Sequence, residues 1–144
     1  MNISTIKELE NWIADNCIKN KITPGNRFET DDGVGLEKYG NLYIWYYSER
    51  GEKENLNYFE TEKEATEFVY EYIRKDKYAN SHLVGSFKDQ NLKSELRSEL
   101  KNRNIKYWND EISYSPNQRI VRFFVYRCDI KKVLDLKERY MVEK

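Results

Sequence analysis

Histidine, the side chain that most often carries acid-base catalysis near neutral pH, is scarce in this 144-residue sequence. The chain has one, His82, and a Ser-His or Cys-His nucleophile would have to be built around that single imidazole. No Gly-x-Ser-x-Gly segment is present to expose a serine on a sharp turn. We therefore expect no catalytic residue, and we predict that the protein is not an enzyme.

Residues that bind metals or phosphates are also few. Cys17 and Cys128 stand in unlike contexts, with a spacing that suits neither a zinc site nor a disulfide scaffold, so we expect reduced core thiols. The pair Asp31-Asp32 lacks the regular ligand spacing of a calcium loop. Gly33-Val34-Gly35 precedes a strand and does not connect a strand to a helix, so we interpret it as a turn and not as a phosphate-binding loop. The sequence predicts no metal and no cofactor.

Long hydrophobic runs are missing as well. The longest apolar stretch, Leu42 to Tyr47, is far shorter than the roughly 20 residues that a membrane-spanning helix needs. The segment Met1-Asn2-Ile3-Ser4 lacks the basic and then apolar order of a signal peptide. We expect a cytoplasmic protein without a membrane partner.

Charged residues are abundant and unevenly distributed. The 25 Lys and Arg balance the 25 Asp and Glu, but residues 1–72 carry 8 basic against 15 acidic side chains, and residues 73–144 carry 17 against 10. The two halves could neutralise each other by docking, or they could present different electrostatic surfaces to partners. Aromatic residues reach 15% of the chain, which argues against disorder. The length fits a single domain with one core over residues 1–144.

Helix signals recur along the chain. Two Thr-x-x-Glu capping boxes, at Thr5 and Thr61, each precede a stripe of apolar residues at helical spacing. Ser86 or Asp89 could cap a third helix that carries Leu92, Leu96 and Leu100, and Asp129 is expected to cap the last one.

Extended, aromatic segments separate these helices. Gly40-Asn41 joins two of them and predicts a tight hairpin. The later strand is expected to be interrupted at Asn109-Asp110. The expected strands are Val34 to Tyr39, Leu42 to Ser48, Leu56 to Phe59, Ile105 to Trp108 with Ile112 to Ser115, and Arg119 to Arg127. The pattern predicts an α+β fold, with an antiparallel sheet of about four to six strands and helices packed on it, in the approximate order α-β-β-β-α-α-β-β-α.

The strand Leu42 to Tyr47 is apolar on both faces. Alternation sends Tyr43, Trp45 and Tyr47 to one face and the intervening side chains to the other. One face must pack on helices, and the other either lies under Lys and Arg stems or the loop Asn20 to Gly33, or is left for a partner. The carboxylates of the adjacent turn are Glu49, Glu52 and Glu54.

The segment Tyr39 to Gly51, followed by Tyr58 to Ala65, resembles small immunity proteins of bacterial polymorphic-toxin and contact-dependent growth inhibition systems. In those proteins an aromatic hairpin ends in a Glu-Arg-Gly-like turn and leads into a Thr-Glu-x-Glu-Ala helix start. The resemblance implies a non-enzymatic protein that binds the C-terminal domain of a cognate toxin, expected to be a nuclease, and neutralises it as a monomer or weak homodimer. On this hypothesis the partner-binding residues are Tyr43, Trp45, Tyr47, Glu49, Glu52 and Glu54.

Two other functions remain open. The basic second half could form a nucleic-acid-binding module, although the zero net charge of the whole chain makes this the second choice. The residues of that module would be Lys101, Arg103, Lys106, Arg119, Arg122, Lys131 and Lys132. A third possibility is an enzyme with a carboxylate-centred site that leaves no recognisable motif.

Overall fold

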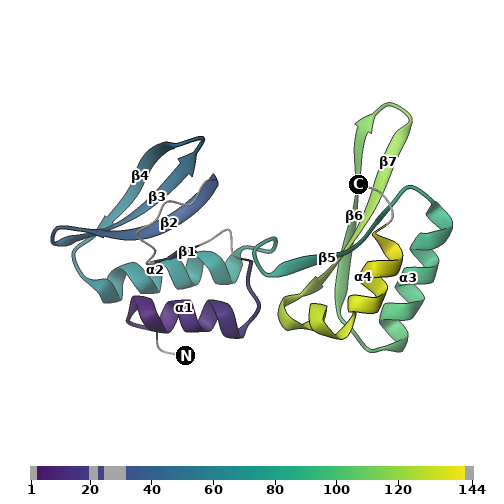
Figure 1. Cartoon of the computed structure of the whole chain (residues 1–144), viewed down its shortest axis with the longest axis horizontal. Helices are drawn as coiled ribbons and strands as arrows, with labels where there is room; N and C mark the ends of the chain where they lie inside the picture. Colours follow the sequence, from purple (N-terminus) through teal and green to yellow (C-terminus); the bar gives the residue numbers. More distant parts are fainter. Residues whose placement is uncertain (1–2, 20–22, 25–31, 142–144) are drawn as a thin grey trace. The chain divides into compact units, whose positions relative to one another are not determined.

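The computed structural model describes residues 3–19, 23–24 and 32–141 and divides the chain into two compact units, Met1–Asn80 and Ser81–Lys144 (Figure 1). Each unit combines helices with a largely antiparallel sheet and has its own hydrophobic core. The predicted α+β fold is confirmed, but with two sheets and two cores in place of one. That the units act together as one domain stays a prediction.

The first unit is a helix-covered meander. Its sheet has the order β1-β2-β3-β4, in which β2, β3 and β4 pair antiparallel and the short β1 pairs parallel to β2. The helices α1 and α2 cover one face of this sheet (Figure 1). The elements are α1 (Ile6–Asp15), β1 (Thr23–Pro24), β2 (Asp32–Tyr39), β3 (Leu42–Glu49), β4 (Glu52–Phe59) and α2 (Glu62–Lys75).

Both helices of this unit begin where the capping boxes predict. The hydroxyl of Thr5 accepts a hydrogen bond from the backbone N–H of Glu8, whose carboxylate accepts one from the N–H of Thr5 in return. Thr61 accepts from the N–H of Glu64 at 3.1 Å. These contacts satisfy backbone donors that a helix cannot satisfy itself, so the helix starts are confirmed.

Two tight turns set the register of the meander. Gly40 supports the predicted hairpin, and Tyr39 pairs with Leu42 beside it. In the second turn both Arg50 and Gly51 have positive φ, 51° and 83°. A two-residue loop of this kind follows the twist of the strands. Pairing therefore resumes at once, and β4 is longer than the predicted strand, which began four residues later.

The segment Gly33-Val34-Gly35 is not the predicted turn, because it lies inside β2. A Cβ built on Gly35 would stand 2.6 Å from the phenol oxygen of Tyr46 on the neighbouring strand. Glycine is therefore needed here for the close approach of a ring to the backbone. Of the loop expected over Asn20 to Gly33, residues 20–22 and 25–31 lie outside the described residues, and with them Asp31 of the pair Asp31-Asp32.

The second unit has a three-stranded sheet of order β5-β7-β6 with its helices on one face (Figure 1). Its core includes Val84, Phe87, Leu96, Phe123 and Tyr140. The elements are β5 (Ser81–Phe87), α3 (Gln90–Asn102), β6 (Tyr107–Ser115), β7 (Gln118–Tyr126), the 3-10 helix η1 (Arg127–Lys132) and α4 (Leu134–Tyr140).

Of three expectations for this unit, one is confirmed and two are wrong. Asp89 caps α3, as predicted, by accepting from the N–H of Asn91 at 2.9 Å. The strand β6 runs without a break through Asn109-Asp110, and its irregularity lies further on, between Ser113 and Ser115. Asp129 does not cap the last α-helix, because it lies within the 3-10 helix that precedes it.

The cysteines also differ from the prediction. Both Cys17 and Cys128 are disulfide-bonded, and the described part of the chain includes no free thiol. The expectation of reduced core thiols is therefore wrong; both residues are half-buried and lie outside the two core clusters. Disulfides are rare in the reducing cytosol, so this finding does not support the predicted cytoplasmic location.

Candidate partner-binding site

All six predicted partner-binding residues lie on one face of the first sheet. Tyr43, Trp45 and Tyr47 alternate along β3 and therefore share a face. The pairing of Tyr47 with Glu54, and of Glu49 with Glu52, places the three glutamates on that face as well. This is the face that α1 and α2 cover in part (Figure 1).

The helices remove part of this face from the surface. Trp45 is 1% exposed and contacts Phe68 and Tyr72 of α2 edge-on, with ring centroids 6.3 Å and 5.2 Å away. Tyr43 is half-buried against the same cluster. The structure thus corrects the prediction for Trp45, whose ring fills the core and cannot reach a partner, and leaves Tyr43 only partly accessible.

The opposite face of β3 follows the expectation that long cationic stems cover it. Tyr46 is 1% exposed, and the ammonium of Lys53 lies 4.6 Å from the centre of its ring. The same ammonium forms an ion pair with Glu37 at 3.0 Å. Lys53 therefore places its ammonium near the face of an aromatic ring and pairs it with a carboxylate.

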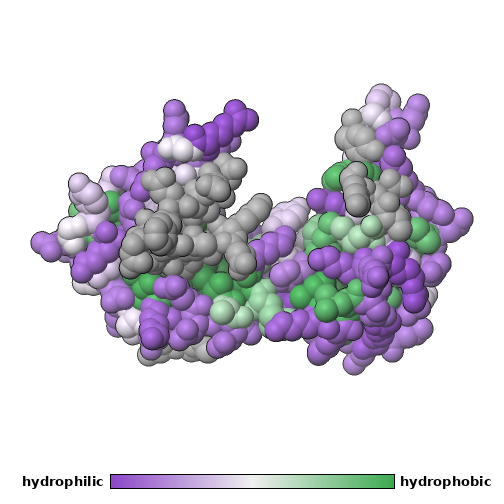
Figure 2. Space-filling view, in the orientation of Figure 1, coloured by the Kyte–Doolittle hydropathy of each residue, from purple (hydrophilic) through white to green (hydrophobic). Residues whose placement is uncertain are grey.

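The end of the β3–β4 hairpin stays exposed beyond the helices. Tyr47, 38% exposed, lies there with Glu49, Glu52 and Glu54. The phenol of Tyr47 donates to a carboxylate oxygen of Glu49 at 3.3 Å. The described residues that line a hollow of about 510 Å³ here are Tyr47, Glu49, Arg50, Glu52, Lys53 and Glu54. The tip projects as a hydrophilic part of the visible surface (Figure 2).

The acidic side chains of α2 have mainly structural roles. Glu62 accepts from the backbone N–H of Ile6 at 2.8 Å and so ties the start of α2 to α1. The guanidinium of Arg74 donates to Glu71 at 2.8 Å and lowers the pKa of that carboxyl. The glutamates of the hairpin tip therefore suit partner binding better than those of the helix do.

A second hollow lies beside the first and shares Tyr47 with it. Its volume is about 240 Å³, and the described residues that line it are Lys19, Gly33, Val34, Tyr47, Tyr72, Asp76, Tyr78 and Ala79. One carboxylate oxygen of Asp76 accepts from the backbone N–H groups of Tyr78, at 3.0 Å, and Ala79, at 3.2 Å.

Sequence reasoning missed this hollow. Tyr72 fits the apolar stripe of the predicted helix, and Tyr78 falls in a connection with no periodic pattern. The available signal is the density of tyrosine near the end of α2, at Tyr70, Tyr72 and Tyr78. That density does not distinguish a core residue from a surface residue.

Two of the seven cations of the proposed nucleic-acid patch form close ion pairs within the second unit. Arg122 forms a two-pronged pair with Asp110 at 2.9 Å and 2.6 Å, and Arg103 does so with Asp135 at 2.8 Å and 2.6 Å. Weaker pairs join Arg119 to Glu111 at 3.8 Å and Lys132 to Asp129 at 3.3 Å. Cations already paired in this way release fewer counterions on binding phosphates, so the structure adds no support for the nucleic-acid module.

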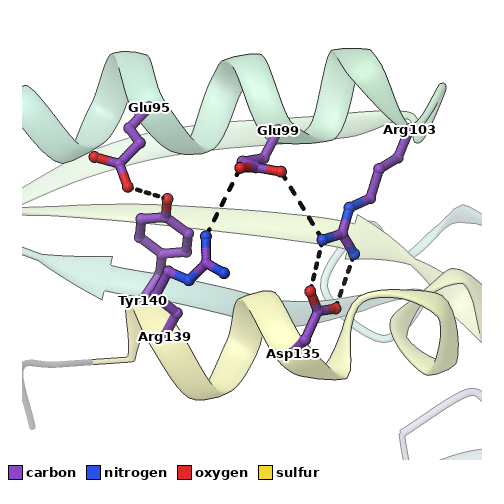
Figure 3. Close-up of polar contacts among 6 residues, drawn as sticks. All are labelled: Glu95, Glu99, Arg103, Asp135, Arg139 and Tyr140. Atoms are coloured by element: carbon purple, nitrogen blue, oxygen red, sulfur yellow. Dashed lines mark hydrogen bonds and ion pairs between the residues drawn. The ribbon is translucent and has the colours of Figure 1, made fainter.

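Figure 3 shows that the Arg103–Asp135 pair belongs to a set of polar contacts that connects α3 to α4. Glu99 lies within ion-pair distance of Arg103, at 3.9 Å, and of Arg139, at 3.7 Å. Tyr140 donates to Glu95 at 2.5 Å; burial, together with this bond, raises the pKa of its phenol. This network links the end and outer face of α3 to α4.

Neither a metal-binding group nor a membrane-spanning helix is found among the described residues. Within them, no three His, Cys, Asp or Glu side chains are grouped so that they could hold a metal ion. The helices found in the same part of the chain are too short or too polar to cross a bilayer.

Comparison of the chain with protein-family models, curated proteins and solved structures finds no match.

Proposed function

We propose that this chain is an immunity protein that binds and neutralises the C-terminal domain of a bacterial toxin. The resemblance of the segment Tyr39 to Gly51 suggests the class, and the exposed tip of the β3–β4 hairpin supports it. There, Tyr47 and three glutamates stay at the surface, whereas Leu36 and Trp45 of the same sheet face are buried under the helices. That single contrast carries the proposal.

Electrostatics favours a basic partner. The unit Met1–Asn80 carries 16 Asp and Glu against 11 Lys and Arg, a net charge of minus five. An enzyme that cleaves nucleic acids needs a basic cleft for its substrate, and acidic side chains that occupy such a cleft both block it and accelerate the encounter. Tyr47 adds an aromatic anchor of the kind that dominates many protein interfaces.

The first experiment mixes the purified chain with the toxin domain encoded by the adjacent upstream gene. We expect a stable complex in size-exclusion chromatography and loss of the toxin's activity. If no neighbouring toxin domain forms a complex, the proposal is wrong.

The second experiment locates the binding surface. Replacing Glu49, Glu52 and Glu54 by Lys should slow association about tenfold or more at low salt and much less at high salt, because exposed charges are screened. The matched control replaces three exposed glutamates elsewhere on the unit, Glu10, Glu60 and Glu67, and changes the net charge equally. Equal slowing of association in both triple variants would mean that the net charge of the unit sets the rate and that the hairpin tip has no specific part in binding.

A further inference from the structure

The smaller hollow combines three tyrosine rings with one fixed carboxylate. Tyr47, Tyr72 and Tyr78 line it and are 38%, 42% and 53% exposed, and Asp76 lies among them. Rings carry negative charge on their faces, so a group of rings beside a carboxylate attracts a cation that has lost part of its water.

Contacts hold two of the three rings and the backbone of the third. Tyr72 rests edge-on against buried Trp45, with centroids 5.2 Å apart. Tyr47 is tethered through its phenol to Glu49, and the backbone of Tyr78 is tied to Asp76 by a 3.0 Å hydrogen bond. A site whose walls are positioned in advance loses less conformational entropy when a ligand enters.

From this geometry we propose that the hollow receives an arginine side chain of the partner protein. The proposal rests on the proposed function and adds the chemistry of the contact. Guanidinium is planar, stacks on aromatic faces and is less strongly hydrated than an ammonium group, so it suits a hollow walled by rings better than lysine does. Asp76 supplies the complementary charge, and the acidic hairpin tip adjoins it through Tyr47.

Lys19 lines the same hollow and its charge opposes an incoming cation. A guanidinium stacked on these rings is still attracted to their faces and to the Asp76 carboxylate, whereas a neutral group of the same shape can stack and donate hydrogen bonds but gains no charge-based attraction to either. The comparison of an arginine probe with its neutral isostere therefore isolates the proposed interaction.

The test titrates the full chain with N-acetyl-arginine-N-methylamide and follows backbone amides by NMR. We expect saturable shifts at Tyr47, Tyr72 and Ala79 with a dissociation constant on the order of 1 mM, and at least tenfold weaker binding of the citrulline analogue, whose urea group is neutral. No shifts, or equal binding of the two probes, would overturn the proposal.

Three substitutions test whether the arginine probe binds in the hollow. Tyr72→Leu should weaken arginine binding about two- to fivefold. Asp76→Asn should do the same or more, and it keeps an oxygen that can accept the two N–H bonds. Tyr58→Leu is the matched control, because Tyr58 is 58% exposed and pairs with Ile44 on the opposite face of the sheet. If Tyr58→Leu weakens binding as much as Tyr72→Leu does, the hollow is not the site.

The two proposals fail separately. The arginine titration contains no toxin, so a chain that binds the arginine probe but no toxin keeps the cation site and loses the immunity function. A chain that binds its toxin but does not distinguish arginine from citrulline keeps the function and loses the arginine contact.

Discussion

Asp135 shows how one well-placed cation fixes the charge of a carboxyl at an exposed position. The guanidinium of Arg103 donates to both of its oxygens and is the main cause that lowers its pKa from 3.8 to about 2. The folded protein therefore binds fewer protons at this group than the unfolded chain does. Its contribution to stability is complete above about pH 4 and is lost as the pH falls through 2.

We predict that Arg103→Gln returns the pKa of Asp135 toward 3.8, because the charge-assisted bonds are lost. The measurement is the carboxyl carbon shift of Asp135 followed by NMR as the pH is lowered. Arg97→Gln, on the same helix, serves as the control and should leave the titration unchanged. A native Asp135 that already titrates near 3.8 would show that the pair does not form in solution.

Trp45 and Tyr47 illustrate which part of the candidate site can be predicted from single residues. Alternation along the strand correctly places both rings on one face. Alternation does not predict where along the strand α2 stops covering that face. The extent of α2 determines that Trp45 is buried and Tyr47 is exposed. The glutamates of the tip were identifiable because Glu49 to Glu54 is a polar run between two strands, with no core to enter.

The helix α2 carries much of the first core on its inner side, so its N-terminal cap should matter for the whole unit. Ala65, Val69 and Ile73 are all fully buried in the first cluster. Thr61 positions this row by fixing the first turn of the helix.

We expect Thr61→Ala to lower the free energy of unfolding of the first unit by about 1 kcal/mol, since backbone donors lose their partner. Urea unfolding followed by amide signals of β3 measures this loss. Ser98→Ala on the exposed side of α3 removes a hydroxyl that caps nothing and should be neutral or slightly stabilising. Equal effects of the two substitutions would exclude a capping role.

Elements whose ends are marked by local chemistry were predictable, and the others were not. The helix starts at Thr5, Thr61 and Asp89 follow from side chains that reach their own backbone. The extra length of β4 comes from a turn in which Arg50 adopts a positive φ. An arginine in the sequence does not predict that conformation. The start of α4 has no side-chain cap, so no local signal marks it.

The molecule has two cores that share no residue. Leu36 is fully buried in the first and Leu136 in the second. Sequence composition gives the total apolar area but not its division, because aromatic and aliphatic residues occur throughout both halves.

We predict that Leu36→Ala costs about 2–5 kcal/mol through the lost methyl groups and the cavity, and that it lowers hydrogen-exchange protection in β2–β4. Leu136→Ala, the matched variant, should act on β5–β7 instead. If either substitution lowers protection in both sheets by the same amount, the two units unfold together and the chain behaves as the single domain that its length suggests.

The unit Ser81–Lys144 carries 14 Lys and Arg against 9 Asp and Glu, so its charge of plus five cancels the minus five of the first unit. Near its isoelectric point of about 6.6 the chain is therefore a large zwitterion and not an uncharged particle. In dilute buffer the oppositely charged units of neighbouring molecules can attract one another, and added electrolyte suppresses this attraction beyond a Debye length. The consequence is salting-in: the chain dissolves better in moderate salt than in pure water, and exchange resins of either sign retain it.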